Sequence, residues 1–215
     1  MGLLGDSLSR RAGISYEQLL LDRICKPLGM NDTRIKLSEE MQNRFPVGHD
    51  HDLRPMKGFE RLSLAGVGGI RSTVNDFLKF LAAVLNAGDD QVSKAILASQ
   101  AARTNIGVAG VEVAWGWHFP TMSDEIITHS GLTSGFHSFM GVNPKRNRAV
   151  VIFSNCAHSS GNIGMRLLRL YRQVKPQYRR DFTQTSPFVR KDSNRARHPK
   201  RTRWHRKRRW IQVCT

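Results

Sequence analysis

The sequence of 215 residues predicts an α+β fold, because the spacing of its apolar residues changes along the chain. Through residues 1–110 the apolar positions mainly follow the three- and four-residue spacing of amphipathic helices. Residues 111–174 contain short runs rich in β-branched and aromatic residues, separated by turn-forming residues, and then one more helical pattern. Helices followed by an antiparallel sheet with a covering helix define the α+β class.

Two helices are predicted at the start of the chain. Residues 2–13 have helical spacing and end in a glycine, which is typical of a helix C-terminus. Ser15 then caps a second helix, with Gln18 at the capping-box position. The stretch 27–29, which contains a proline and a glycine, ends this helix.

The next two helices carry a similar signature. Thr73 and Asp76 have the spacing of a capping box, and the amphipathic pattern that follows them ends at Gly88. Residues 92–102 continue the helical pattern. The mainly helical part of the chain therefore closes before residue 110.

Three strands are predicted, at 125–131, 135–142 and 149–155, the last two forming a hairpin through the turn sequence NPKRN. A final helix over 162–174 should cover one sheet face. The side chains expected to face the sheet are Ile163, Leu167, Leu170 and Val174.

The net charge of +17 is concentrated in residues 175–215, which hold 14 Lys and Arg against Asp181 and Asp192. This tail has no apolar periodicity, and we expect it to be disordered when free. Trp204 and Trp210 among the basic residues suggest nucleic-acid binding by stacking and phosphate contacts. A solvated or frame-shifted tail is the favoured interpretation, because a charge run alone specifies no partner.

Composition also restricts the location and the cofactors. No apolar run reaches the roughly 20 residues of a membrane span, and the N-terminus has no signal-peptide pattern, so the chain as written is expected to stay cytoplasmic. The cysteines at 25, 156 and 214 lack the spacing of a zinc site or a disulfide framework. We expect neither a metal nor a cofactor.

Three motifs are interpreted structurally. Ser7 lies in the esterase-like letters GDSL, but only six residues precede it and no D-x-x-H follows, which favours a helix-surface hydroxyl. Residues 66–73, GVGGIRST, resemble a phosphate loop without its Gly-Lys-Ser/Thr, which favours a turn entering a helix. His49 and His51 form a metal-like pair, but no third ligand can be identified.

Residues 129–136, HSGLTSGF, are the strongest candidate site. A strand delivers His129, Ser130 and Gly131 at its end, where an imidazole, a hydroxyl and accessible backbone N–H groups suit recognition of a carbonyl or carboxylate. A structural turn with a hydrogen-bonded histidine explains the same residues equally well when they are taken alone.

Four segments, 24–35, 64–83, 116–119 and 129–155, together resemble the serine β-lactamase and penicillin-binding-protein superfamily, with class C β-lactamases and D-alanyl carboxypeptidases as the most similar members. The resemblance covers residues 2–174 and implies a β-lactamase/transpeptidase-like fold. It implies acyl-serine hydrolysis of a β-lactam, a peptide or an ester.

In this superfamily the nucleophile is the serine of S-x-x-K, activated by its lysine and by the tyrosine of Y-x-N. His129-Ser130-Gly131 resembles the third motif, on the strand that faces the nucleophile. The resemblance implies that His129 and Ser130 contact the carboxylate or ester region of the substrate. It also implies that the backbone N–H of Leu132 donates to the oxyanion.

The printed sequence departs from the superfamily in two motifs. No serine is followed three residues later by lysine, and no tyrosine is followed two residues later by asparagine. The resemblance places Y-x-N just before the helix at 2–12, so we expect an N-terminally truncated chain that is inactive alone. A separate N-terminal fragment is then a candidate partner. The alternative is a non-catalytic binding module whose tail contacts nucleic acid or whose cleft holds cell-wall peptides.

Overall fold

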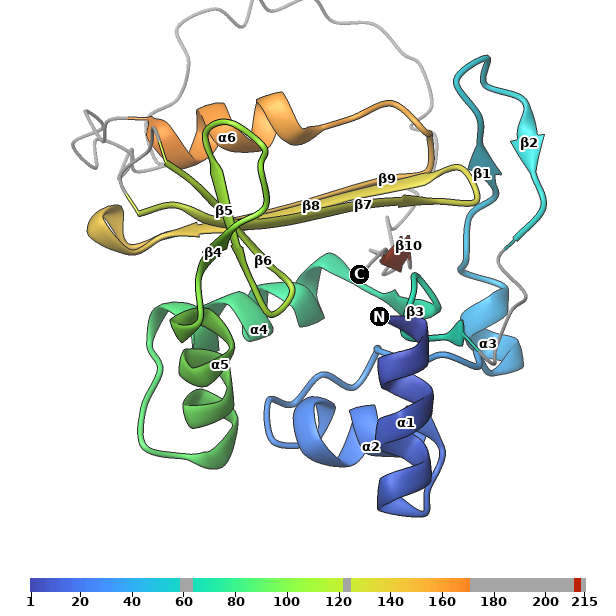
Figure 1. The fold of residues 1–215 in the computed structure, drawn as a ribbon. Coiled ribbons are helices and arrows are strands. Elements are labelled where there is room, and N and C mark those ends of the chain that lie inside the picture. The colour runs from blue at the N-terminus through green and yellow to red at the C-terminus, as the bar shows by residue number, and fades with distance from the viewer. Residues whose placement is uncertain (59–63, 122–124, 171–210, 214–215) are drawn as a thin grey trace, which may run out of the picture. The chain divides into compact units, whose positions relative to one another are not determined.

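The structure, a computed structural model, describes residues 1–58, 64–121, 125–170 and 211–213. The chain divides into two units, one formed by residues 1–169 with 208–215 and the other by residues 170–207. All of the described helices and strands belong to the first unit (Figure 1).

The two N-terminal helices form as predicted. Helix α1 (Gly2–Ala12) ends at Gly13, whose φ of 67° places it in the left-handed region that favours glycine. Helix α2 (Tyr16–Leu20) begins after Ser15, whose side chain accepts the N–H of Gln18. A π-helical turn over Leu21–Cys25 continues α2, and the chain then turns through Gly29.

Short elements connect these helices to the rest of the unit. They are a brief helix and four short strands, and the strands form two antiparallel pairs, β1 with β2 and β3 with β10. These elements are α3 (Glu39–Gln42), β1 (Gly48–His49), β2 (Pro55–Met56), β3 (Ile70–Ser72) and β10 (Ile211–Val213). Strand β10 lies within the tail for which the sequence predicts no regular structure. The rest of the tail, and the proposed boundary at residue 175, lie outside the described residues.

Helix α4 (Val74–Leu85) begins at Thr73, whose side chain accepts the N–H of Asp76 as predicted. It ends at residue 85 rather than at the predicted Gly88. Helix α5 (Gln91–Ala101) is capped by Asp90, which accepts the N–H groups of Val92 and Ser93.

The carboxylate of Asp76 has a second function. It accepts the N–H of Asp32 at 2.7 Å and the hydroxyl of Thr33 at 2.9 Å, and it pairs with Lys79 at 3.1 Å. The side chain of Asp76 is 3 % exposed. This buried carboxylate therefore ties the loop after the π-helical turn to the first turn of α4.

A six-stranded antiparallel sheet has the order β4-β5-β6-β7-β8-β9. The three predicted strands are β7, β8 and β9, and the predicted hairpin joins β8 to β9. The sequence did not predict β4, β5 and β6, which are two to four residues long. The bounds are β4 (Thr104–Asn105), β5 (Val111–Ala114), β6 (Trp117–Pro120), β7 (Ile127–Thr133), β8 (Phe136–Asn143) and β9 (Arg148–Ser154).

Helices cover both faces of the sheet, with α4 on one side and α6 (Gly161–Arg169) on the other (Figure 1). On the α4 side, Leu81 packs with Trp117, Val142 and other apolar residues of the sheet. On the α6 side, Leu168 packs with Phe139 and the neighbouring Ile126. The expected helix-covered α+β architecture is confirmed.

The predicted face of the last helix is wrong. Ile163 and Leu167 are 60 % and 41 % exposed, whereas Leu168 is fully buried. The reason is Gly164, at which an added Cβ would lie 2.1 Å from the ring of Phe139, so that only glycine lets the helix approach this closely. Leu170 is also exposed, and Val174 lies outside the described residues.

Within the described residues no helix is both long and apolar enough to cross a lipid bilayer.

Candidate functional site

Strand β7 carries the predicted site residues on alternate faces. His129 is paired in register with Met140, and Ser130 with Phe139, which packs on the α6 side. Because successive side chains of a strand point to opposite faces, His129 lies on the α4 side and Ser130 and Leu132 on the other. Leu132 is 52 % exposed. The structure therefore directs the imidazole and the hydroxyl of the motif to different faces of the sheet.

The half-buried ring of His129 is fixed by two neighbours. Its Nδ1 lies 2.8 Å from the carbonyl oxygen of Gly116. A carbonyl oxygen only accepts hydrogen bonds, so Nδ1 carries the proton and donates, and Nε2 of the neutral ring is an acceptor. The ring also stacks on His118, with centroids 5.4 Å apart and planes 13° apart.

The charge state of His129 follows from this environment. Burial lowers the pKa of His129 below the usual imidazole value, the proximity of His118 lowers it further, and the bond to Gly116 opposes the shift. The ring is therefore neutral at neutral pH. A bound group meets an acceptor nitrogen here rather than a positive charge.

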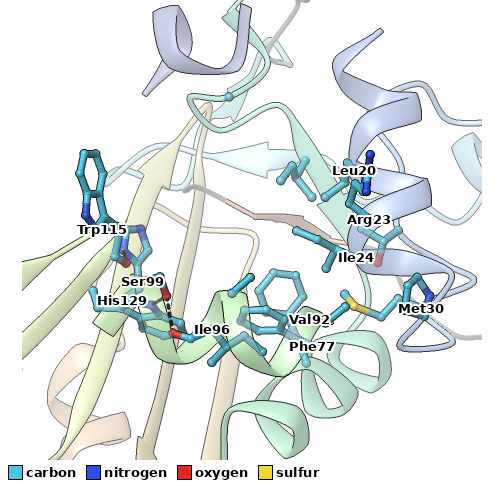
Figure 2. Close-up of a pocket in the computed structure, with 18 of the residues that line it drawn as sticks. Leu20, Arg23, Ile24, Met30, Phe77, Val92, Ile96, Ser99, Trp115 and His129 are labelled. Atoms are coloured by element: carbon cyan, nitrogen blue, oxygen red, sulfur yellow. Dashed lines mark hydrogen bonds between the residues drawn. The ribbon is translucent and has the colours of Figure 1, made fainter. Parts of the chain in front are cut away.

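His129 lines a cavity of about 880 Å³ between the sheet and the helices. Figure 2 shows Leu20, Arg23 and Ile24 on one side of this cavity and Trp115 and His129 on the other. Most of the lining is apolar, and Ser130, Gly131 and Leu132 do not contribute to it. Apolar pockets with a few polar groups are typical of small-molecule sites.

Helix α5 and strand β6 form a part of the cavity wall that is joined by hydrogen bonds. The indole N–H of Trp117 donates to the hydroxyl of Ser99 at 2.9 Å, and this hydroxyl donates to the carbonyl of Ile96 at 2.6 Å. Phe80 stacks on Trp117 with the two planes 4° apart. Trp115, 67 % exposed, lies beside this wall (Figure 2).

The sequence predicts His129 as a candidate site residue but does not predict this cavity. The wall combines residues of α2, α4, α5 and β6, and each of these has an ordinary core pattern in its own segment. Trp115 and Trp117, which are separated by one glycine, are a local aromatic signal, and the segment 116–119 is part of the family resemblance. The cavity arises from the tertiary packing.

Ser7 and the glycine-rich stretch have the structural roles interpreted from the sequence. Ser7 lies exposed on α1, and residues 66–69 form a turn leading into β3 and the cap of α4. Gly68 has a φ of 77°, which explains a glycine at that turn.

The two histidines of the HDHD stretch, His49 and His51, contact different residues. Nδ1 of His49 lies 3.0 Å from the carbonyl oxygen of Asn155, whereas His51 packs edge-on against His158 with ring centroids 5.2 Å apart. Among the residues that the structure describes, no group of three or more His, Cys, Asp or Glu side chains is arranged to hold a metal ion.

A comparison with protein-family models gives a match to the family described as Beta-lactamase over residues 1–173. The chain belongs to the beta-lactamase family. Among curated beta-lactamase relatives, an enzyme of Yersinia enterocolitica named "Beta-lactamase" is 27% identical over 141 residues, which is 61% of this chain and 35% of the relative. The Escherichia coli K12 protein "D-alanyl-D-alanine-carboxypeptidase/endopeptidase AmpH" is 27% identical over 161 residues, or 67% of this chain and 40% of the relative.

Solved beta-lactamase structures have the same fold. A "Beta-Lactamase/D-Alanine Carboxypeptidase" from Pseudomonas syringae superposes with a TM-score of 0.64 at 17% identity, covering 74% of this chain and 53% of that one. A class C beta lactamase from Rhodobacter sphaeroides gives 0.62 at 20% identity, with 74% and 54% coverage. The chain thus spans about half the length of these structures and 35% to 40% of the two curated relatives.

Proposed function

We propose that this chain is the substrate-cradling, C-terminal part of a serine hydrolase of the beta-lactamase family and is inactive by itself. The observation that carries the proposal is the position of His129, the first residue of a third-motif match, in the wall of an apolar cavity. The motif lies within β7 rather than at its end, because the strand continues to Thr133. The complete hydrolase would act on a β-lactam, a D-alanyl peptide or an ester.

The chemistry explains why the chain alone is expected to be inert. Acyl-enzyme formation needs a hydroxyl beside a base, and the printed sequence has neither S-x-x-K nor Y-x-N. What it supplies to the cavity is the acceptor nitrogen of His129. The hydroxyl of Ser130 lies on the other face of β7, and the backbone N–H of Leu132 is the proposed oxyanion donor. Without an attacking group, donors and acceptors of this kind can hold a carbonyl compound but do not open it.

The first test incubates the purified chain with a chromogenic cephalosporin and with p-nitrophenyl acetate. We expect no turnover above the buffer rate and, by intact-protein mass spectrometry, no acyl adduct on serine. The ester assay uses the double variant Cys156→Ser, Cys214→Ser, in which the remaining cysteine is the buried Cys25, so that a thiol reaction is not mistaken for serine chemistry. Turnover by the chain that is lost in His129→Ala, or a penicillin adduct on any serine, would refute the proposal.

A second test adds a separate polypeptide carrying the S-x-x-K and Y-x-N motifs of a class C relative. We expect the mixture to hydrolyse the cephalosporin although neither component does so alone, and His129→Ala to lower this restored rate. Failure of the mixture to bind, measured by size-exclusion chromatography, would argue against complementation and in favour of a binding module.

A further inference from the structure

A thiol and an imidazole meet outside the cavity, just after strand β9. Sγ of Cys156 lies 3.0 Å from Nδ1 of His158. Cys156 is half-buried and His158 is exposed, so the pair borders on solvent. A nucleophile within hydrogen-bonding reach of a base is the arrangement by which proteins activate thiols.

Backbone hydrogen bonds hold Cys156 in place. On one side of it the carbonyl of Asn155 accepts the N–H of His49 at 3.0 Å, and on the other the N–H of Ala157 donates to the carbonyl of His49 at 2.9 Å. The N–H of Cys156 itself donates to the hydroxyl of Ser154 at 3.2 Å. The position of the sulfur is therefore set by strand-like pairing between segments about a hundred residues apart in the sequence.

A second imidazole supports the base. The ring of His51 packs on the ring of His158 at 73°, with centroids 5.2 Å apart, which limits the orientations that His158 can take. This gives the thiol, the base and a neighbour that orients the base, which is the general pattern of an activated nucleophile.

The charged groups around the pair are largely engaged in their own loop. The carbonyl of Asp50 lies 3.7 Å from Sγ, and its carboxylate accepts the N–H groups of Asp52 and Arg54. The side chains of Asp52 and Arg54 pair with each other at 3.3 Å. His158 is thus the described side chain placed to take the thiol proton.

The other cysteine that the structure describes, Cys25, differs from Cys156 in its exposure and its neighbours. Cys25 is 2 % exposed within the apolar cluster around Leu20, Met30 and Phe77. Burial, together with the charge of Asp76, raises the pKa of Cys25 to about 11, so its thiol stays protonated and inaccessible. One chain therefore contains a sequestered thiol and one paired with a base.

We propose that Cys156 and His158 form a reactive thiol site that is modified by small, soft electrophiles such as activated alkyl halides. Nδ1 of His158 takes the thiol proton, and the sulfur lone pair attacks the carbon that carries the leaving group. The S–C bond forms as the C–halogen bond breaks, the halide departs with the bonding electrons, and the imidazolium returns its proton to water.

The test measures alkylation by iodoacetamide at pH 7 in a Cys214→Ser background, with peptide mapping to assign each site. An ordinary thiol is only a few per cent ionised at this pH, so a base can raise its rate by at most ~30-fold. We expect Cys156 to react about tenfold faster than it does in His158→Gln. Cys25 should remain unlabelled over the same period.

Ser159→Ala is the matched control, because it alters the neighbouring exposed residue without touching the thiol, and its rate should equal that of the parent. Equal rates in the parent and in His158→Gln would overturn the proposal. If Cys25 becomes labelled in His158→Gln, that variant has unfolded. In that case the alkylation rate of Cys156 in the parent chain is compared with that of N-acetylcysteine. A rate no faster than that of N-acetylcysteine overturns the proposal, and a faster rate supports it.

Discussion

His129 and His137 lie on neighbouring strands and are kept neutral in different ways. His129 donates from Nδ1 to the carbonyl of Gly116, whereas Nδ1 of His137 accepts the N–H of Ser160 at 3.4 Å and lies 3.0 Å from its hydroxyl. Burial lowers the pKa of His137, as it does for His129. Protonation at Nδ1 of His137 would remove the acceptor for the backbone just before α6.

These two histidines make stability depend on pH. Because their folded-state pKa values lie below the unfolded value of about 6.5, the unfolded chain binds more protons in the range just below pH 6.5. We therefore expect the free energy of unfolding to be at its full value above pH 7 and to fall as the pH is lowered toward 5. Urea denaturation at several pH values measures this. In His137→Asn, whose amide oxygen replaces the acceptor, the decline should be shallower, and an unchanged slope would contradict the assignment.

The tautomer of His129 can be observed directly. We expect nitrogen NMR at pH 7 to show a protonated Nδ1 and an unprotonated Nε2. Since the ring carries no charge at that pH, it would attract a carboxylate electrostatically only after protonation. A spectrum with Nε2 protonated at pH 7 would contradict the hydrogen bond to Gly116. The control is His118→Phe, which keeps an aromatic ring stacked beside His129.

At the scale of elements, α6 shows how close packing decides which face is buried. Leu167 and Leu168 are adjacent in sequence but differ completely in environment, one 41 % exposed and the other fully buried beside Phe139. The helix lies against the sheet at Gly164, with the exposed Ile163 on one side of it and the half-buried Met165, which packs against the same apolar cluster, on the other.

Alanine substitution of Leu167 and of Leu168 tests which face of α6 is buried against the sheet. We expect Leu168→Ala to lower the free energy of unfolding by about 2–5 kcal/mol, because it leaves a cavity between α6 and the sheet. Leu167→Ala should cost roughly 0.5 kcal/mol or less, as is usual for surface positions. Chemical denaturation of both variants measures the difference in the free energy of unfolding. Equal losses of stability would contradict the observed burial of Leu168 and favour the face predicted from periodicity.

The same comparison shows which features the sequence can predict. The caps at Ser15 and Thr73 were predictable, because each is a local hydrogen bond between residues three apart. Strands β4 to β6 were missed because runs of two to four residues are too short to show alternation. The buried face of α6 was predicted wrongly because it depends on the contact between Gly164 and Phe139, which are on different elements of the fold.

At the scale of the whole molecule, the described residues have the beta-lactamase fold, and the motif in the sequence predicts His129 as a candidate site residue. The cavity beside it was not predicted, since its wall is assembled from residues between Met1 and Met140. Its mainly apolar lining is in contact with solvent at its mouth, which is unfavourable unless something covers it. A ligand or a polypeptide that occupies it should therefore stabilise the fold.

An apolar fluorescent dye, anilinonaphthalene sulfonate, tests whether the cavity is accessible. We expect the folded chain to bind the dye and Ala95→Phe, which places a ring in the cavity from α5, to reduce its fluorescence at least about twofold. Ala98→Phe is the matched control, because Ala98 is exposed on the same helix and does not line the cavity. Equal dye binding by the two variants would show that the dye binds elsewhere.

The contact between Gly164 and Phe139 has a consequence for how this chain can vary. A methyl group at position 164 would overlap two ring atoms of Phe139, at 2.1 and 2.2 Å, so the helix would have to lift away from the sheet. A smaller side chain at 139 alone would open a void under the helix. Substitutions at positions 139 and 164 can therefore preserve the packing only when they compensate each other. The loss of stability caused by a substitution at either position depends on the residue at the other.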